Sequence, residues 1–335
     1  MGDRRPTMRD VAAAAGVSLK TVSRVVNGES FVRPDTAERV RDAIARLGFQ
    51  RNDLARTLRG GGRTRSIGLI IEDVANPFYS QIARGVEDVA RAGGRLVISG
   101  SSDEDPAREL LLIRSLCERR VDGLLIVPSQ TGDPRRRAEL IAGTPAVFLD
   151  RPADDPAADT VLIDNLGGAR TAVDHLLAHG HRRIACLVDL PEIFTARQRH
   201  QGYLEALAAH GVQADPALVR TGRHDVRGAG HAMTELLALP DPPTAVFAGN
   251  NLLTVGALRA IGAAGTRTAL VGFDDVELAD LLATPVTVIA HEPADMGRQA
   301  AELLEGRIRG DTGPPARILL PTRLVARGSG EIPPG

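Results

Sequence analysis

The chain has little cysteine and few aromatic residues. Its 335 residues include two cysteines, two tyrosines, seven phenylalanines and no tryptophan. Cys117 and Cys186 lie far apart, in segments that predict a helix and a buried strand, so neither a disulfide framework nor a cysteine-based metal site is expected. The sequence also lacks an apolar run long enough to cross a bilayer, and no apolar segment follows Arg4 and Arg5 as it would in a signal peptide. We therefore expect a cytoplasmic protein.

Lysine is almost absent as well, and the charge is unevenly distributed. The 41 basic residues include a single lysine, Lys20. Residues 1–65 contain 14 Lys and Arg against 7 Asp and Glu, whereas the rest of the chain contains 27 against 35. A basic segment attached to an acidic body is typical of a nucleic-acid-binding module, because only the module must displace counterions from phosphate. The length and a hydrophobic content of 43% otherwise fit a globular protein of two or three domains.

The segment 7–27 contains two short amphipathic stretches joined by an Ala-Gly-Val turn. Thr7 and Asp10 have the spacing of a capping box, Gly16 provides the turn, and Ser18 caps the second helix. The pattern alone also fits an ordinary surface hairpin of helices. Two helices joined in this way, however, can place the second one in the major groove of DNA. The segment therefore predicts a helix-turn-helix.

A third helix is predicted over 33–47, because Pro34 favours its start and Gly48 its end. It completes a small three-helix unit. A very short helical segment follows over 52–59, and three glycines at 60–62 prevent its continuation. About eight residues are too few to hold a helix in water, so this segment is expected to fold only on a partner.

From residue 66 onward, apolar strands alternate with helices in two similar rounds. Alternation of this kind predicts parallel sheets covered by helices on both faces, and ligand sites in such folds lie at the carboxyl ends of the strands. Strands are predicted at 66–73, 95–99, 123–128, 146–150, 161–164, 183–188, 218–220, 244–249, 268–272 and 317–320, and helices at 80–91, 107–119, 135–141, 167–179, 196–210, 227–239, 252–263 and 292–305.

Six sequence blocks in a fixed order resemble the lactose repressor family of bacterial transcription regulators. They are the DVA, AGVS and TVSRVVN runs within 10–27, LARTL at 54–58, NPFYSQIARGVE at 76–87, VDGLLIVP at 121–128, GHRRIA at 180–185 and VGFDD at 271–275. The resemblance implies an all-α helix-turn-helix domain joined to an α/β domain of the periplasmic-binding-protein type, built of two doubly wound parallel-sheet subdomains. The implied divisions are a DNA-binding domain at 1–50, a hinge helix and linker at 51–62, and an effector-binding and dimerisation domain at 63–335, whose N-subdomain comprises about 63–163 and 292–321 and whose C-subdomain comprises about 164–291 and 322–330.

The resemblance also assigns DNA contacts. Lys20 and Arg24 suit the guanine acceptors O6 and N7, whereas Leu19 offers an apolar contact to a base. A second group of side chains is expected to bond phosphates, which sets the register on the duplex: Thr7, Ser18, Thr21, Ser23 and Asn27. In the hinge, Ala55 and Leu58 share one face, and Leu58 matches the leucine that the family inserts between base steps of the minor groove. Arg51 stands where the family usually has proline.

In the α/β domain, polar side chains at strand ends are expected to meet in the cleft between the subdomains. Carboxylates, guanidinium groups and amides together suit a ligand rich in hydroxyl groups, so we expect a sugar or a related polyhydroxy effector, with a nucleobase as the alternative. Only Phe78 and Phe194 are placed to stack on such a ligand. The candidate effector-binding residues are Asp73, Asn76, Phe78, Asp150, Arg151, Phe194, Arg199, Asn250 and Asp274.

Other functions have weaker support in the sequence. Asp274 and Asp275 could form a catalytic carboxylate pair, but adjacent residues at a turn usually diverge and no nucleophile accompanies them. His175, His179 and His181 invite a metal site, but Gly180 interrupts their helix. We therefore expect no enzyme activity, no cofactor and no metal. The sequence predicts a homodimeric transcription regulator, most simply a repressor of operator DNA controlled by a small effector, and the alternative is a solute receptor of a transport system, which would require export.

Overall fold

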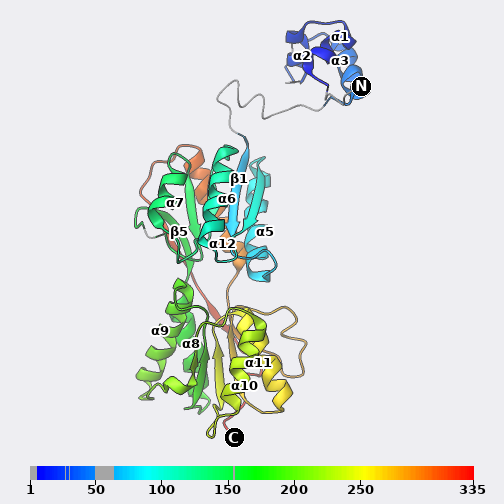
Figure 1. Ribbon diagram of the computed structural model, residues 1–335. Helices are drawn as coiled ribbons and strands as arrows, with labels where there is room; N and C mark the ends of the chain where they lie inside the picture. The colour runs from blue at the N-terminus through cyan, green and yellow to red at the C-terminus, as the bar shows by residue number, and fades with distance from the viewer. Residues whose placement is uncertain (1–5, 27, 30, 50–63, 154) are drawn as a thin grey trace. The chain divides into compact units, whose positions relative to one another are not determined.

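The computed structural model describes residues 6–26, 28–29, 31–49, 64–153 and 155–335. The chain divides into two compact units, Met1–Thr64 and Arg65–Gly335 (Figure 1). We call them the helical unit and the α/β unit. The predicted hinge segment, with Arg51, Ala55 and Leu58, lies outside the described residues, as does Asn27. No helix in the described ranges is long and apolar enough to span a bilayer.

The helical unit contains α1 (Met8–Ala15), α2 (Leu19–Val26) and α3 (Pro34–Leu47). The predicted capping box is confirmed, because the Thr7 backbone N–H donates to Asp10 Oδ2 at 2.7 Å and the Asp10 N–H donates to Thr7 Oγ1 at 3.4 Å. Gly16 ends α1 with φ of 66°, the left-handed conformation that glycine adopts without strain. On α2, Val22 is fully buried, and Val25 and Val26 pack against the same small core.

One lobe of the α/β unit, which we call the N-lobe, is built on a six-stranded parallel sheet with the order β11-β5-β4-β3-β1-β2. Helices α5 and α12 pack together on one face, and α6 and α7 pack on the other (Figure 1). The strands are β1 (Ser66–Ile71), β2 (Leu96–Ser101), β3 (Leu124–Ile126), β4 (Ala146–Leu149), β5 (Asp159–Ile163) and β11 (Arg317–Leu320), and the helices are α5 (Pro77–Ala92), α6 (Pro106–Glu118), α7 (Pro134–Ile141) and α12 (Pro293–Ile308).

The second lobe, the C-lobe, repeats this plan with the strand order β12-β10-β9-β8-β6-β7. Helices α8 and α9 pack together, as do α10 and α11. The strands are β6 (Ile184–Leu187), β7 (Val219–Arg220), β8 (Ala245–Ala248), β9 (Ala269–Phe273), β10 (Thr287–Ala290) and β12 (Arg323–Val325), and the helices are α8 (Asn165–Ala178), α9 (Phe194–Ala209), α10 (Val226–Leu237), α11 (Asn251–Ala264) and the short 3-10 helix η1 (Pro216–Leu218).

The chain crosses between the lobes three times, after β5, after β10 and after β11 (Figure 1). The predicted fold class is confirmed: a helical DNA-binding-type unit and two doubly wound sheets. The sequence-based prediction missed two strands, β10 and β12. Strand β12 has only three residues and is the one antiparallel strand of its sheet, so it has no strand–helix–strand context that would have revealed it. Strand β10 is a four-residue apolar run that follows a long loop, and a run of that length does not distinguish a strand from a buried loop.

Candidate functional site

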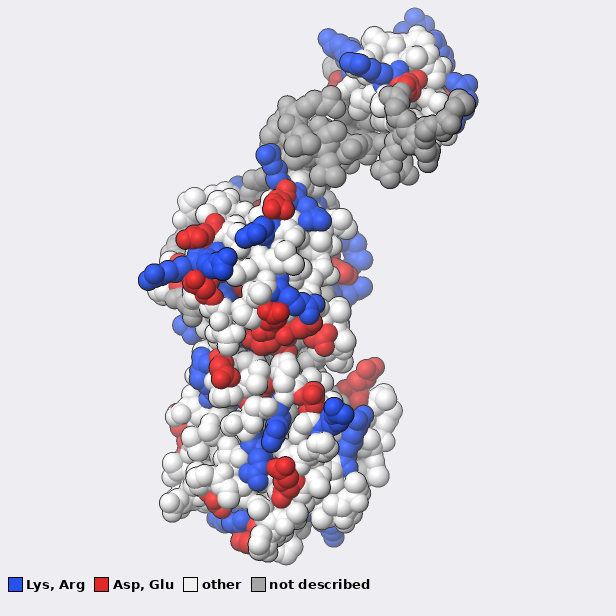
Figure 2. Space-filling model, in the orientation of Figure 1, with Lys and Arg blue, Asp and Glu red and all other residues white. Residues whose placement is uncertain are grey.

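A polar cavity lies between the two lobes, where the carboxyl ends of the strands of both sheets meet. It holds about 410 Å³ of empty space, part of which is open to solvent. Figure 2 shows acidic side chains gathered where the lobes meet. The cavity is lined from the N-lobe by Glu72, Asn76, Phe78, Tyr79, Asp150 and Arg151, and from the C-lobe by Asp189, Ile193, Thr195, Arg199, His224, Asn250, Asn251, Leu252 and Asp274.

Of the nine predicted effector residues, the structure brings seven to this cavity and leaves Asp73 and Phe194 out of its lining. Successive side chains of an extended strand end point in opposite directions, so Glu72 faces inward while Asp73 Oδ1 accepts the backbone N–H of Ala75 at 2.8 Å. Phe194 is the first residue of α9, where neighbouring side chains are rotated by about 100° from one another. Its neighbours therefore line the cavity in its place, and no stacking surface forms at Phe194.

The prediction missed eight lining residues: Glu72, Tyr79, Asp189, Ile193, Thr195, His224, Asn251 and Leu252. Glu72 and Asp189 follow strands β1 and β6, so the strand-end argument used for their neighbours could have found them. His224 comes from the loop before α10, which has no strand end directly in front of it. The sequence alone therefore gave no signal that His224 lines the cavity.

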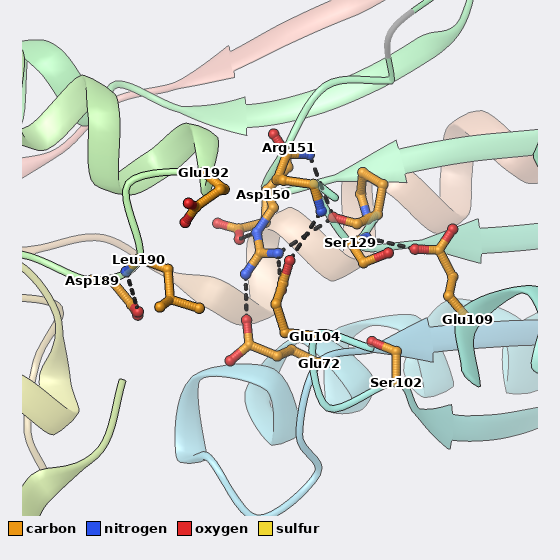
Figure 3. A network of polar contacts seen from close by, with 12 residues as sticks. Glu72, Ser102, Glu104, Glu109, Ser129, Asp150, Arg151, Asp189, Leu190 and Glu192 are labelled. Carbon is orange, nitrogen blue, oxygen red and sulfur yellow. Dashed lines mark hydrogen bonds and ion pairs between the residues drawn. The ribbon is translucent and has the colours of Figure 1, made fainter. Parts of the chain in front are cut away.

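Arg151 organises the N-lobe wall of the cavity (Figure 3). Its guanidinium is buried and pairs with the carboxylates of Glu72 and Glu104. The Tyr79 hydroxyl donates to Glu72 Oε2 at 2.9 Å. Burial, reinforced by the Glu72 charge, holds the pKa of Tyr79 well above its ordinary value, so the phenol remains a donor. In this wall, Glu72 accepts hydrogen bonds from both Tyr79 and Arg151.

Arg199 organises the C-lobe wall. Its Nε donates to Asn165 Oδ1 at 2.8 Å, and its Nη1 donates to the Gly249 carbonyl at 2.6 Å. The guanidinium lies 3.8 Å from the centre of the Phe273 ring, a cation–π arrangement, and 3.5 Å from Asp274 Oδ2. These contacts fix the side chain in one orientation, with its charge at the cavity.

Two carboxylates occupy matching places in the two lobes but differ in their electrostatics. Asp150 follows β4 with φ of 62°, and Asp274 follows β9 with φ of 67°. Burial raises the pKa of Asp150 to about 6, against the opposing effect of Arg151. Burial also tends to raise the pKa of Asp274, but Arg199 and a 2.9 Å contact between Asp274 Oδ1 and His291 Nε2 outweigh it and lower that pKa. Asp274 is thus stabilised as an anion, whereas Asp150 lacks comparable partners.

Two polar contacts between described side chains cross the cavity from one lobe to the other. Asn251 Nδ2 donates to Asn76 Oδ1 at 2.8 Å. His224 Nε2 lies 3.4 Å from Glu72 Oε1, while its Nδ1 lies 2.8 Å from Asp189 Oδ1 within the C-lobe. These contacts join the lobes directly.

Of the predicted DNA-contacting residues that the structure describes, Thr7 caps α1 and the others lie on α2 or directly before it. Leu19 is 46% exposed, and Lys20 is exposed as well. Arg24 Nε lies 3.7 Å from Glu29 Oε2. Ser18 Oγ accepts the Thr21 N–H at 3.2 Å, which confirms the predicted cap of α2. Thr7 and Ser23 are partly buried.

The alternative sites suggested by the sequence have structural roles. Asp275 turns away from Asp274 and forms a 2.7 Å ion pair with Arg327. His175 Nε2 lies 2.5 Å from Glu331 Oε1, and His181 Nε2 lies 2.8 Å from the Ile332 carbonyl oxygen. These histidines hold the last residues of the chain against the C-lobe. Within the described residues, no three His, Cys, Asp or Glu side chains gather as metal ligands would.

Comparison with known proteins finds a matching family model in each of the two units. Residues 7–52 match the model of bacterial regulatory proteins of the lacI family, and residues 173–330 match that of a periplasmic binding protein-like domain. The HTH-type transcriptional regulator CelR of Thermobifida fusca is 38% identical over 340 residues, which cover 98% of this chain and 99% of that protein.

Two solved structures extend the comparison. A complex of the transcriptional regulator CelR with cellobiose is 36% identical with a TM-score of 0.73, covering 97% of this chain and 100% of that one. The Lac repressor dimer bound to operator and the anti-inducer ONPF is 30% identical with a TM-score of 0.85, covering 98% of this chain and 99% of that one.

Proposed function

The chain belongs to the lacI family of bacterial regulatory proteins, and from this premise we propose that it is a dimeric repressor whose affinity for operator DNA is set by a small polyhydroxy effector in the interlobe cavity. It is a DNA-binding transcription regulator and not an enzyme. We place its work in the cytoplasm, where a bacterial operator is accessible.

The observation that carries the effector proposal is the composition of the cavity lining. Four carboxylates, two guanidinium groups and five side-chain amides or hydroxyls line it: Glu72, Asp150, Asp189, Asp274, Arg151, Arg199, Asn76, Asn250, Asn251, Thr195 and Tyr79. A carboxylate or guanidinium can bond two neighbouring hydroxyl groups at once. The cavity offers few apolar surfaces, which favours a sugar over a nucleobase. The cellobiose bound to the related CelR supports the same class.

We assign the two predicted carboxylates different tasks toward the effector. Asp274 is held by Arg199 and His291, so its carboxylate is already oriented before it accepts a further hydrogen bond from a hydroxyl. Asp150 is buried, and Arg151 Nε approaches its Oδ2 at 3.5 Å. A hydroxyl donor from the effector would supply the hydrogen bond that its burial demands.

On the DNA side, we propose that Lys20 and Arg24 bond base edges, that Leu19 makes an apolar base contact, and that Thr7, Ser18, Thr21, Ser23 and Asn27 bond phosphates. Arg24 would exchange its exposed partner Glu29 for a guanine. Exposed ion pairs at such distances contribute little, so this exchange is inexpensive. The hinge contacts of Ala55 and Leu58 belong to the same proposal.

Effector and operator are coupled by linkage in this proposal. A ligand that favours one arrangement of the lobes shifts the population toward it by as much as its affinities for the arrangements differ. The arrangement in turn decides whether both hinge segments of a dimer can fold on one pseudo-palindromic operator.

The test uses the full chain. An operator is first selected from a random DNA pool, and the protein is then screened by thermal shift against sugars and nucleobases. Binding of the best compound and its effect on operator affinity are measured for the parent, for Arg199→Ala and for the matched control Arg170→Ala, an exposed arginine on α8 of the same lobe.

We expect Arg199→Ala to lose the effector response while it keeps its operator affinity, and Arg170→Ala to behave as the parent. An Arg199→Ala protein that responds at the parent's effector concentration would remove the cavity from the proposal.

A further inference from the structure

His224 lies between carboxylates of the two lobes, at the edge of the cavity. Its side chain is 38% exposed and lies between two carboxylates, Asp189 on its own lobe and Glu72 on the other. A neutral imidazole has one donor and one acceptor nitrogen, so only the imidazolium can donate to both carboxylates. The geometry therefore favours the charged form of His224.

The groups around His224 reinforce this charge. Glu104, in the loop before α6, is the third carboxylate that acts on it, and Arg151 lies behind Glu72 and Glu104, with which it is paired. Asp189 is itself held by Asn250 Nδ2 at 3.0 Å and by the Leu190 N–H at 2.6 Å. The hydrogen bond that His224 donates to Asp189 raises the pKa of His224 to about 9 against the effect of burial, and the charges of Glu72 and Glu104 add to it.

The neighbouring interlobe contact differs in one respect. Asn251 and Asn76 are joined by a 2.8 Å hydrogen bond between amides, which do not titrate. The two contacts span the same cavity, so a change of pH acts on one and leaves the other intact. The His224 contact therefore stabilises the closed arrangement of the lobes in a way that depends on pH, whereas the contact between Asn251 and Asn76 stabilises it independently of pH.

We propose that protonated His224 is an interlobe bridge that holds the two lobes of the α/β unit together without a ligand, by joining Asp189 of the C-lobe to Glu72 of the N-lobe. Closure of the empty cavity is then coupled to the uptake of a proton. An effector that enters must part this bridge or incorporate it.

The direction of the pH dependence follows from which carboxylates remain close to His224 when the lobes separate. When the lobes separate, Asp189 remains beside His224, whereas Glu72 and Glu104 move away. The pKa of His224 is therefore higher in the closed form than in the open form. The bridge is at full strength at pH values below the pKa of the open form, and it is lost as the pH rises through about 9. Each unit of difference between the two pKa values changes the closed-to-open ratio about tenfold.

The test measures the separation of the lobes in the full chain with no effector present, so its outcome does not depend on the proposed effector site. Nitroxide labels are placed at Arg135→Cys on α7 and Arg197→Cys on α9, two exposed positions on different lobes, in a Cys117→Ser background in which Cys186 stays buried. Electron–electron double resonance gives the distance distribution at pH 7 and pH 10, with labelled chains diluted into unlabelled ones.

Three variants of the labelled chain are compared. His224→Gln removes the charge, His224→Arg keeps it at both pH values, and His231→Gln removes an exposed histidine of α10 as a matched control. We expect the parent and His231→Gln to open severalfold more at pH 10, His224→Arg to stay closed at both, and His224→Gln to be open at both. A His224→Gln protein with the parent's distribution at pH 7, or one that keeps the parent's pH dependence, would overturn the proposal.

Discussion

The proposed DNA-binding surface of the helical unit and the cavity of the α/β unit differ in how their polar side chains are arranged for binding. On the helical unit, the predicted DNA-contacting side chains Leu19 and Lys20 are exposed, and Arg24 pairs with the exposed Glu29. In the cavity of the α/β unit, Arg151 and Arg199 are buried and already bonded before any ligand arrives. An exposed surface binds a polyanion through charge, whereas a buried one needs groups oriented in advance, because an unpaired polar group there is costly.

The largest effect expected from this comparison is on stability, at Arg151. Arg151→Met keeps much of the volume but leaves Glu72 and Glu104 without their buried cation. Removing one partner of a buried pair typically costs about 3–5 kcal/mol. We expect urea denaturation to show a loss of that size for the α/β unit. Arg91→Met, which breaks an exposed pair with Asp88, is the matched control and should change stability by less than about 1 kcal/mol. Equal losses in both variants would contradict the distinction between buried and exposed charges.

The two matched carboxylates of the cavity give a second test, with opposite signs. Asp150 keeps its proton up to a pKa of about 6 in the folded chain but only to about 3.8 when unfolded. Stability therefore falls as the pH rises between these values. Asp150→Asn should be more stable than the parent at pH 8, by about 1–3 kcal/mol, and equal to it near pH 4.

Asp274→Asn should behave in the reverse way. The pKa of Asp274 is lowered by Arg199 and His291 against burial, so its contribution is present above a pH of about 3.8 and is lost as the pH falls through the lowered value. The variant should lose roughly 1.5–3 kcal/mol at neutral pH. Denaturation curves of both variants across the pH range give the change in the free energy of unfolding. If both substitutions change it in the same direction at pH 8, burial alone governs both carboxyl groups.

The same contrast explains how much of the structure was predictable. Helix caps are local signals, so Thr7, Gly16 and Ser18 located α1 and the start of α2 correctly from the sequence. In the α/β unit, the alternation of strands and helices predicted the two sheets, and the strand-end rule located Asp150 and Asp274 in the cavity.

What could not be predicted is the pairing across the fold. Glu104 and Arg151 are 47 residues apart, and His224 and Glu72 are separated by more than three times that distance in sequence. No local period relates such positions. The absence of Asp73 and Phe194 from the cavity lining has a smaller cause: a shift of one residue at the end of a strand or the start of a helix turns a side chain away from the cavity.

A third prediction concerns base recognition on the exposed surface. Lys20→Ala should weaken binding to the selected operator by about 1–3 kcal/mol and relax the preference at one base pair of each half-site, because a base contact carries sequence information. The control is Arg41→Ala, which removes an exposed positive charge from α3. Titrations on the operator and on random DNA separate the outcomes. If Lys20→Ala weakens both DNAs equally, Lys20 contacts only phosphate.

The smallest effect is expected at Thr7, where a folding role and a DNA role coincide. Thr7 Oγ1 accepts the Asp10 N–H, and the Thr7 N–H donates to Asp10 Oδ2. Loss of such a cap costs typically about 1 kcal/mol. Thr7→Ala should therefore speed hydrogen exchange of the α1 amides in the full chain about fivefold, while Thr7→Ser, which keeps a hydroxyl acceptor, should leave it nearly unchanged.

Asp10→Asn separates the two roles of Thr7, because it weakens the capping box but leaves the Thr7 hydroxyl in place. If Thr7 also bonds a phosphate, Thr7→Ala should bind operator more weakly than Asp10→Asn when the two variants exchange α1 amides at similar rates. If the two variants match in operator affinity as well, the hydroxyl acts only through the helix. DNA binding by the exposed surface would then depend on the capping hydrogen bonds of α1, just as the cavity depends on the hydrogen bonds and ion pairs among its own side chains.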